Sequence, residues 1–386
     1  MAYGSVLLSF VGIFRILTCI VLDCSVRLGN SGLKVSKIIL GCMSYGSTTW
    51  APWLLNEEEG IKHIKVAYDA GINTFDTANI YSNGLSEVIL GKAIKQLNLP
   101  REEIVVMTKA SLFSIILISF MMNYSLLYNS YMHIDPTPNY QGGVYMTFEK
   151  ADQDGYVNQY GGSRKHIFAT VKASLERLQL DYIDVLQYHR VDPSAPLEET
   201  MQALHDVVKA GYVRYIGMSS CRAWQCTMMF LPSDYAINNK LTPFISMQNH
   251  YNMVYREEER EMVPTLKHFG VGSIPWSPLA RGMLTRPMSA QTSRGETDMM
   301  MKGYENESST KIVERVEEIA KKKGVTMAQV SLAWLLSKET VAAPVIGTTS
   351  VKNLIDLVDA VNLKLTEEEV KYLDEPYQAL PIFGFY

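Results

Sequence analysis

Hydrophobic and polar positions follow two recurring patterns along most of this chain. Short runs rich in β-branched residues, apolar almost throughout, predict buried strands of a parallel sheet. Segments with apolar residues at steps of three and four positions predict amphipathic helices. The predicted strands comprise residues 35–41, 71–76, 103–109, 182–189, 213–219, 243–248, 271–276 and 341–347. The predicted helices comprise residues 57–71, 163–180, 194–211, 313–324 and 326–339.

The order of these elements predicts an α/β fold with a parallel sheet. Strands that alternate with helices form βαβ units, in which the helix connects one strand to the next. Eight such strands over this length favour a closed (β/α)8 TIM barrel over an open, doubly wound sheet. Ahead of the first strand, residues 26–36 place Gly29 and Gly32 around Asn30 and Ser31, which is typical of a β-hairpin. We expect this hairpin to plug the bottom of the barrel.

Composition and charge narrow the function classes. The 386 residues are 47% hydrophobic and 20% charged, which allows a sizeable core in one large barrel with additions or in two ordinary domains. The formal net charge of -4 and the lack of a dense Lys/Arg block argue against a nucleic-acid partner. The five cysteines are scattered without a CxxC pair, which indicates a reducing compartment, so we expect a cytoplasmic protein. The sequence has no zinc-ligand spacing, P-loop or GxGxxG fingerprint, so a nucleotide has to be bound by other means than a Rossmann turn.

The first residues form an apolar extension that differs from the rest of the chain. Residues 5–22 are apolar apart from a few small polar residues and Arg15. A membrane anchor or a signal sequence has this composition, although Arg15 is costly inside a bilayer and no basic residue precedes the apolar run. The alternative is an extension unrelated to the fold. We therefore divide the chain into an extension at 1–25 and a barrel at 26–386, and expect membrane contact only if the extension is an anchor.

A second atypical stretch follows the third predicted strand. Residues 111–143 contain no Lys, Arg or Glu and have neither clear helical nor clear strand periodicity, whereas the flanking chain is well charged. An inserted loop of this length in a barrel is uncommon, and it would act as a lid over the substrate. A translated intron has the same kind of composition. The alternative to a lid is a segment that displaces Lys109 and abolishes activity.

Polar residues stand at the ends of several predicted strands, which is where (β/α)8 barrels carry their active sites. Asp76 ends the second strand, Tyr81 lies in the loop after it, Lys109 ends the third strand and His189 ends the fourth. Singly, each residue has an ordinary structural role, such as a helix cap for Asp or a solvated charge for Lys. Together, on consecutive strand ends, they form a proton-transfer set, and these four are the candidate catalytic residues.

This set suits the reduction of a carbonyl group, which requires a hydride at carbon and a proton at oxygen. An ammonium group stabilises a neighbouring phenolate, so we expect Lys109 to lower the pKa of Tyr81 and make it a better acid. Asp76 is expected to hold Lys109 charged and to fix its direction. His189 is expected to donate a hydrogen bond to the carbonyl oxygen. This chemistry needs no metal.

Around these residues the sequence resembles the aldo-keto reductase family. Residues 71–94 (GINTFDTANIYSNGLSEVILGKAI) resemble the family's signature around the catalytic Asp and Tyr, 105–110 its Lys strand, and 181–190 its His strand. The resemblance covers residues 26–110 and 145–375, in order. Within the family, the chain is most similar to fungal reductases of the aryl-alcohol dehydrogenase and versiconal hemiacetal acetate reductase kind. The resemblance implies NADP(H)-dependent reduction of a small aromatic or polyketide-derived aldehyde or ketone, as in fungal secondary metabolism.

The resemblance also implies a set of binding positions at the mouth of the barrel. Segments 211–220, 245–252, 275–285 and 344–354 are similar to those that bind NADP(H) in the family. It assigns the nicotinamide to Ser219, Ser220, Gln248 and Trp276, the pyrophosphate to Ser277, Leu279 and Gly282, and the adenosine phosphate to Gly347, Ser350, Asn353 and Asp356. The substrate pocket is assigned to Met43, Trp50 and Trp53, the two tryptophans alternatively capping the barrel rim.

The sequence departs from the family pattern where the 2′-phosphate of NADPH is expected to bind. Many relatives have a basic residue at the position of Asn353 and an Asn at that of Leu357, so Lys352 and Arg281 are the candidates to supply the charge. The alternative function is a catalytically impaired or regulatory NADPH-binding barrel protein, because some barrels of this family serve as channel subunits.

Overall fold

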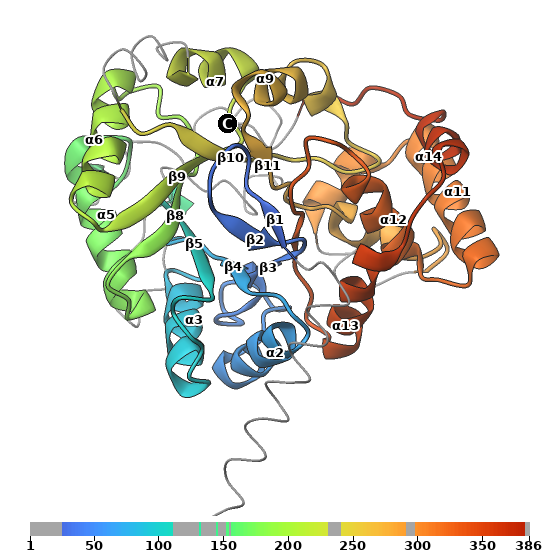
Figure 1. The fold of residues 1–386 in the computed structure, drawn as a ribbon, viewed down its shortest axis with the longest axis horizontal. Coiled ribbons are helices and arrows are strands. Elements are labelled where there is room, and N and C mark those ends of the chain that lie inside the picture. The colour runs from blue at the N-terminus through green and yellow to red at the C-terminus, as the bar shows by residue number, and fades with distance from the viewer. Residues whose placement is uncertain are drawn as a thin grey trace, which may run out of the picture.

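The computed structural model describes residues 25–110, 131–132, 144–145, 152–153, 156–230, 241–290 and 298–382. Its main sheet has eight parallel strands in the order β11-β10-β9-β8-β5-β4-β3-β12. Figure 1 shows these strands at the centre of the molecule, with helices arranged around them. The strands are β3 (Ile39–Gly41), β4 (Thr74–Asp76), β5 (Val105–Ala110), β8 (Ile183–Tyr188), β9 (Val213–Ser219), β10 (Phe244–Gln248), β11 (Gly272–Ser273) and β12 (Val345–Ile346).

The sheet closes on itself between β11 and β12. The amide of Ala342 donates to the carbonyl oxygen of Ser273 at 2.8 Å, and the amide of Val345 donates to that of Pro275 at 2.9 Å. β12 in turn pairs with β3 at the other edge of the sheet. The strands therefore surround a common axis, and the predicted (β/α)8 barrel is confirmed.

Helices connect the strands and cover the outside of the barrel. The five predicted helices are confirmed as α2 (Glu57–Asp69), α5 (Arg164–Leu178), α6 (Leu197–Lys209), α11 (Glu307–Lys323) and α12 (Met327–Leu336). The side chains of Asn56, Ser163 and Thr326 cap α2, α5 and α12. Each accepts a hydrogen bond from a first-turn amide that has no acceptor within the helix. The other helices of the described residues are α3 (Leu85–Gln96), α7 (Ala223–Phe230), α9 (Met262–Phe269), α13 (Val351–Asp359) and α14 (Glu367–Asp374), with the 3-10 helices η1 (Cys42–Ser44), η3 (Glu257–Glu259), η4 (Ala280–Thr285), η5 (Met299–Tyr304) and η6 (Ala360–Asn362).

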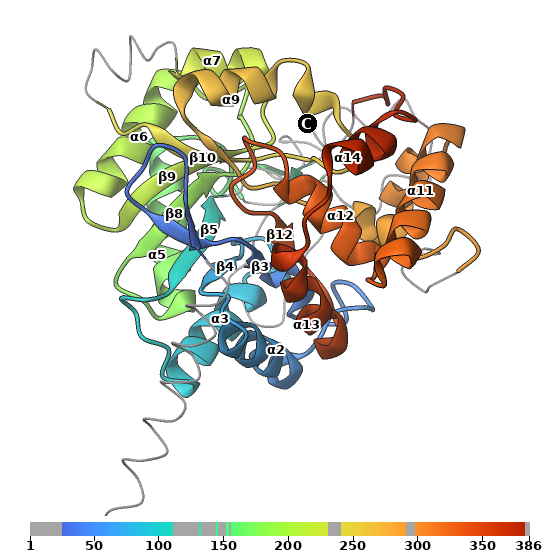
Figure 2. The ribbon, with the colours of Figure 1, turned by 45° about the vertical axis from the view of Figure 1, so that its right-hand side comes forward.

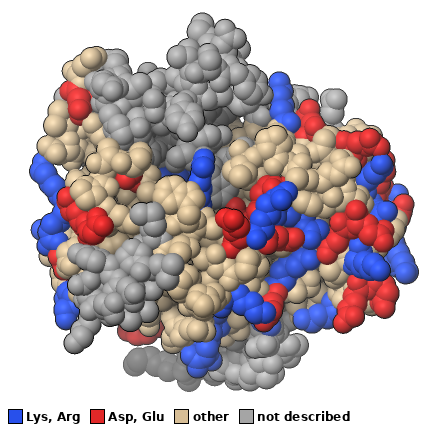
Figure 3. All heavy atoms as spheres, turned by 90° about the horizontal axis from the view of Figure 1, so that it is seen from above, with Lys and Arg blue, Asp and Glu red and all other residues tan. Residues whose placement is uncertain are grey.

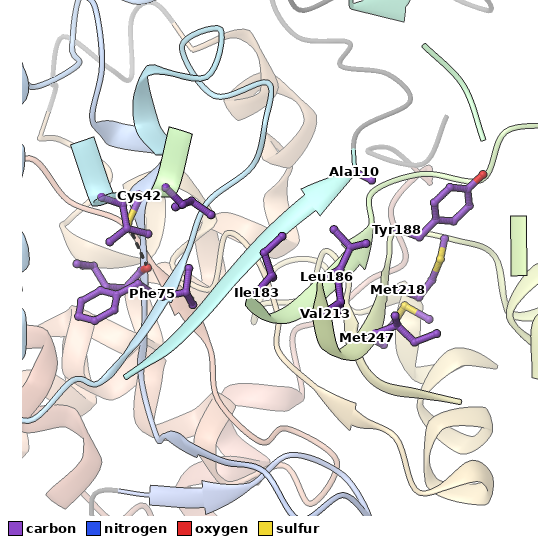
Figure 4. Packing of buried hydrophobic residues seen from close by; sticks show 14 of the residues in the cluster. Cys42, Phe75, Ala110, Ile183, Leu186, Tyr188, Val213, Met218 and Met247 are labelled. Atoms are coloured by element: carbon purple, nitrogen blue, oxygen red, sulfur yellow. Dashed lines mark hydrogen bonds between the residues drawn. The ribbon is translucent and has the colours of Figure 1, made fainter. Parts of the chain in front are cut away.

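Two apolar layers stabilise the barrel. Outward-facing side chains of the strands pack against the helices, and Figure 4 shows several of them, among them Phe75, Leu186 and Met218. Inward-facing side chains such as Met107 and Val185 fill the interior. Because burying one large apolar side chain contributes about 1.5–3 kcal/mol, these two layers supply most of the favourable free energy of folding.

The hairpin predicted ahead of the barrel is confirmed. β1 (Ser25–Arg27) pairs antiparallel with β2 (Lys34–Ser36), and Leu28 and Val35 are fully buried among the interior residues of the barrel. Figure 1 shows the hairpin in front of the barrel strands, so it covers one end of the barrel. Gly29 has a φ of +57°, and a Cβ there would lie 2.5 Å from the carbonyl oxygen of Gly270, so only glycine fits this close approach.

The first predicted strand is wrong in extent. Residues 35–41 form the end of β2 and the whole of β3, with a turn between them. The Ser36 amide donates to Thr74 Oγ1 at 3.0 Å, and the Ser36 hydroxyl donates to the Ile38 carbonyl oxygen at 2.7 Å, which holds that turn. The apolar pattern does not reveal the change of partner because residues on both sides of it are buried.

α11, α12 and α14 form a helical layer beside the barrel, next to β12. Figures 1 and 2 both show α12 between the barrel and α11, and Trp334 of α12 is fully buried there. The outer side of α11 carries the exposed pair Glu307–Lys311 and the pair Glu317–Lys321, in which the lysine is exposed and the glutamate is partly buried. Figure 3 shows Lys and Arg side chains interspersed with Asp and Glu over this part of the surface. Exposed pairs of this kind contribute only about 0.3–0.5 kcal/mol each, so the layer depends on its buried face.

The two atypical stretches lie largely outside the described residues. Of the extension at 1–25, the structure describes Ser25. Of the insertion at 111–143, it describes Tyr131–Met132 (β6). β6 pairs antiparallel with Val144–Tyr145 (β7). None of the helices in the described ranges combines the length and the apolar character that crossing a bilayer requires.

Candidate active site

Side-chain alternation brings the candidate residues to one end of the barrel. Every second side chain of a strand points to the same face. In β5, Met107 lies in the interior and Lys109 follows two positions later; in β8, Val185 lies in the interior and His189 follows on the same face. Asp76 is the last residue of β4, the neighbour of β5. Because the strands are parallel, their carboxyl ends meet at the same edge, as the sequence predicts.

Lys109 is the centre of the site and is completely buried. Its Nζ donates to Asp76 Oδ2 at 2.6 Å, to the Thr77 carbonyl oxygen at 2.8 Å and to Tyr81 Oη at 3.2 Å. The three protons of the ammonium group thus have three acceptors. The phenol oxygen accepts from Lys109, which leaves the phenol proton for another partner. The predicted association of Asp76, Lys109 and Tyr81 is present in the structure.

Tyr81 stands on a strained turn between β4 and α3. The three residues after it, Ser82, Asn83 and Gly84, have positive φ angles of 50°, 52° and 86°. Left-handed backbone costs about 1 kcal/mol or more at each residue other than glycine, so surrounding contacts have to hold it. One such contact is the Ser47 amide, which donates to Ser82 Oγ at 2.8 Å. The turn brings the phenol within reach of Lys109.

Burial and charge act in opposite directions on the two central groups. Burial raises the pKa of Tyr81, and the opposing effect of Lys109 is smaller, so this pKa lies above its ordinary value. The lowered pKa expected for Tyr81 is therefore wrong, because desolvation of the phenolate outweighs the nearby ammonium charge. Burial by itself would lower the pKa of Lys109. The charges and hydrogen bonds of Asp76 and Tyr81 together have a larger, opposite effect, so the pKa of Lys109 lies above its ordinary value. At neutral pH the site holds a phenol beside an ammonium group, which suits a proton donor.

His189 faces Tyr81 across the site. The two rings are in edge-to-face contact with centroids 6.3 Å apart. Burial, with the positive charges of Arg190 and Lys109, holds the pKa of His189 well below its ordinary value. The imidazole is thus neutral at neutral pH and has one N–H group. Arg190, the first residue of the loop after His189, donates to the His189 carbonyl oxygen at 2.6 Å and to Ser219 Oγ at 3.3 Å.

Two glutamines bind the second oxygen of Asp76. Gln187 Nε2 donates to Asp76 Oδ1 at 2.7 Å, and Gln248 Nε2 donates to the same oxygen at 2.9 Å. The family resemblance assigns Gln248 to the nicotinamide, and in the structure its amide nitrogen also donates to the Asp76 carboxylate. Gln187 was missed, and its signal is a polar residue within the apolar run YIDVLQYH, on the same strand face as His189.

A buried ion pair supports the strand that carries Lys109. Thr108 Oγ1 donates to Glu87 Oε1 at 2.6 Å, and Arg177 Nε donates to Glu87 Oε2 at 2.6 Å. Glu87 is fully buried. This carboxylate links β5, α3 and α5, and it therefore fixes the end of β5 relative to the helices around it.

The residues assigned to the nicotinamide gather at the ends of β9, β10 and β11. Ser219 Oγ donates to the Gln248 carbonyl oxygen at 2.8 Å, and Trp276 Nε1 donates to Ser220 Oγ at 3.0 Å. The Trp276 ring stacks on His250 with centroids 4.2 Å apart and is partly exposed. The structure thus brings the four predicted residues together around a fixed aromatic plane.

The loop after β11 contains several residues with left-handed backbone. Positive φ angles occur at Ser277 (50°), Ala280 (47°), Arg281 (56°) and Gly282 (103°). The amides of Ala280 and Gly282 donate to the carbonyl oxygens of Ser277 and Leu279, at 3.0 Å and 2.9 Å, which holds the loop in this conformation. The residues predicted for the pyrophosphate, Ser277, Leu279 and Gly282, all belong to this loop.

Arg281 is committed to a buried ion pair. Its side chain is 5% exposed, and Nη1 donates to Asp298 Oδ2 at 2.6 Å. Breaking such a pair to bind another anion would leave the Asp298 carboxylate buried without its partner. Of the two candidates for the 2′-phosphate, the structure therefore leaves Lys352, which is exposed in the first turn of α13.

The residues assigned to the adenosine phosphate lie at the start of α13 with one exception. Gly347 and Asn353 are exposed, and Ser350 caps the helix by accepting from the Asn353 amide. Backbone amides and the helix dipole favour a phosphate group at such an end. Asp356 instead accepts from Thr326 Oγ1 at 2.8 Å and connects α13 to α12, which is a structural contact.

The residues assigned to the substrate pocket follow β3. Met43 lies in η1, directly after the strand end, and Trp50 and Trp53 lie in the segment between η1 and α2. All three side chains are partly buried. Their chain position puts them on the same end of the barrel as Asp76 and Lys109.

Comparisons with known proteins place these features in a family. The model of the aldo/keto reductase family matches residues 37–378. Versiconal hemiacetal acetate reductase of Aspergillus parasiticus is 46% identical over 91% of this chain and 96% of its own length. A Schizosaccharomyces pombe protein whose name assigns it to the aryl-alcohol dehydrogenases is 47% identical over 92% of this chain and 96% of its own length. Aldo-keto reductase AFTS1 of Alternaria alternata is 44% identical over 93% of each chain.

Proposed function

The chain belongs to the aldo/keto reductase family, and we propose that it reduces an aldehyde or ketone to the alcohol with NADPH, with Tyr81 as the general acid. Family membership itself makes it an oxidoreductase that acts on carbonyl or alcohol groups with a nicotinamide cofactor. The proposal adds the cofactor form, the residue roles and the substrate class. The observation that carries it is the hydrogen-bonded chain from Asp76 through Lys109 to Tyr81, with His189 facing it.

The side chains divide the task of delivering one proton. The reduced nicotinamide, when bound, supplies a hydride to the carbonyl carbon. Tyr81 donates its proton to the carbonyl oxygen, and the Lys109 ammonium, 3.2 Å away, stabilises the phenolate that forms. Asp76 keeps Lys109 charged and directed at Tyr81. His189, being neutral, donates a hydrogen bond to the same carbonyl oxygen and polarises it.

The residues around the barrel mouth fit an extended dinucleotide. In chain order they are Ser219 and Ser220 with the Trp276 ring that stacks on His250, the loop of left-handed backbone after β11, and the N-terminus of α13. These features suit a carboxamide with its planar ring, a pyrophosphate and an adenosine phosphate in turn. We assign this activity to residues 26–386, with the extension at 1–25 outside it.

Lys352→Ala is expected to weaken NADPH binding by about tenfold and to leave NADH binding nearly unchanged, because a hydrogen bond to a charged phosphate contributes about 1.5–3 kcal/mol. The dissociation constants of both nucleotides, measured by fluorescence titration, test this. Lys321→Ala removes an exposed lysine from α11 and serves as the control. An equal loss for both nucleotides would show that Lys352 does not distinguish the 2′-phosphate.

The substrate class is proposed from the relatives and the pocket. One relative is named for the reduction of versiconal hemiacetal acetate and another for aryl alcohols. Trp50 and Trp53, beyond Met43, offer flat apolar surfaces to an aromatic compound. We therefore propose aromatic or polyketide-derived carbonyl compounds as substrates.

A screen of NADPH oxidation over such compounds tests the proposed function. We expect turnover with aromatic aldehydes such as 4-nitrobenzaldehyde, and a lower kcat/KM with aliphatic aldehydes of the same size, which cannot stack on tryptophan. NADPH alone gives the background rate. Tight NADPH binding without reduction of any carbonyl compound would favour the regulatory alternative.

A further inference from the structure

A buried carboxylate that the proposed reaction does not use lies behind the nicotinamide side of the site. Glu258 belongs to the acidic run of η3 and is 7% exposed. Its neighbours have cationic partners: Glu257 pairs with Arg260, and Glu259 pairs with Arg256. Among the residues that the structure describes, Glu258 has no such partner. A carboxyl group buried without a cation is costly to ionise.

Glu258 is connected to the cofactor side of the barrel through Asn249. Asn249 Nδ2 donates to Glu258 Oε2, and Asn249 Oδ1 accepts from the Ser220 amide at 2.9 Å. Ser220 has a φ of 46°, a strained conformation that this hydrogen bond supports, and its Oγ accepts from Trp276 Nε1 at 3.0 Å. The carboxyl group therefore sets the direction of the Asn249 amide, and through it the position of Ser220 and Trp276.

Glu258 changes its protonation state within the pH range in which enzymes work. Burial raises the pKa of Glu258 to about 8, against the hydrogen bond from Asn249, and the negative charge of Glu257 raises it further. The group is mostly neutral at pH 7 and mostly ionised above its pKa.

The groups that face Glu258 do not neutralise this charge. Across from η3, burial raises the pKa of Cys221 well above its ordinary value, so the thiol stays neutral beside Glu258. Cys226 of α7 interacts with that thiol and adds no positive charge. The basic residues of α9, Lys267 and His268, lie in its last turn, and Lys267 forms an exposed ion pair with Glu339.

We propose that Glu258 is a positioning residue that makes the preference of the site for oxidised over reduced cofactor depend on pH. This inference rests on the proposed binding of the nicotinamide at Ser219, Ser220 and Trp276. The oxidised ring carries a positive charge that the reduced ring lacks. An ionised Glu258 attracts that charge and strengthens the hydrogen bond that orients Asn249. The neutral carboxyl group still orients the Asn249 amide, but it does not attract the positive charge of the oxidised ring.

Binding of both nucleotides to the wild-type protein and to Glu258→Gln, by calorimetry at about pH 6.5 and about pH 9, tests this. In the wild type we expect the affinity for NADP+ relative to NADPH to rise between the two pH values by up to about tenfold, which corresponds to one unit of pKa displacement. Gln keeps an acceptor for Asn249 and mimics the neutral acid. Glu258→Gln should therefore match the wild type near pH 6.5 and lack the rise.

Two further variants separate this effect from a structural role. Glu258→Asp keeps the carboxyl group and is expected to keep a rise with pH. Glu261→Gln removes an exposed charge from the same segment and is expected to behave as the wild type. A rise that persists in Glu258→Gln, or a ratio changed equally at both pH values, overturns the proposal. Wild-type binding of both nucleotides with a pH-independent ratio overturns it alone, whereas binding of neither overturns the proposed function as well.

Discussion

Tyr81→Phe is expected to lower kcat for carbonyl reduction by about 10²- to 10⁴-fold, the range for loss of a general acid, while NADPH binds as in the wild type. The substitution removes only the phenol oxygen, whose contact with Lys109 Nζ is 3.2 Å long. The ring retains its edge-to-face packing on His189, so the site should keep its shape. Single-turnover oxidation of bound NADPH measures the chemical step, and fluorescence titration measures the binding.

A matched control is Tyr68→Phe on α2. It removes a phenol oxygen that donates to Glu103 Oε2 at 3.0 Å. This variant should keep the wild-type kcat. The pH dependence adds a second readout: since the pKa of Tyr81 is raised, reduction by the wild type should stay constant through neutral pH and fall only in the alkaline range. The residual activity of Tyr81→Phe should lack that fall. A kcat close to the wild type in Tyr81→Phe would exclude Tyr81 as the acid.

The parts of the site that could be predicted are those that local pattern determines. Parallel barrel strands are buried on both faces and read as continuous apolar runs, so Lys109 and His189 stand out where the runs end. The parallel topology then requires those ends to meet. The N-terminal hairpin was also predictable from local pattern, because its glycines mark a turn between two short segments.

The parts that could not be predicted depend on contacts between distant segments. Gln248 donates to Asp76 across 172 positions of sequence, and no local periodicity encodes that bond. Arg281 was a candidate for a phosphate until its ion pair with Asp298 was known. The raised pKa of Tyr81 depends on how completely the fold excludes water, which residue types alone do not specify.

The buried pair of Asp76 and Lys109 is expected to show strong non-additivity in stability. Lys109→Met leaves the Asp76 carboxylate without its cation, and Asp76→Asn leaves the Lys109 ammonium without its anion. Removing one partner of a buried ion pair costs about 3–5 kcal/mol, whereas replacing both by neutral groups of similar size is often close to neutral. The double variant should therefore lose less free energy of unfolding than the sum of the single variants, by about 2 kcal/mol or more.

The double variant of Asp76 and Lys109 should not regain turnover, even though it regains part of the lost stability. All three variants lack either the ammonium that stabilises the Tyr81 phenolate or the carboxylate that directs it, so each should reduce carbonyl compounds at least about a hundredfold more slowly. Denaturant unfolding gives the stabilities, and single-turnover kinetics give the rates. The pair Arg101–Asp184 on the same barrel, whose side chains are 20% and 12% exposed, provides a comparison cycle that should change stability with little effect on the rate. If the double variant regained turnover together with stability, the charges of Asp76 and Lys109 would serve folding and not proton transfer.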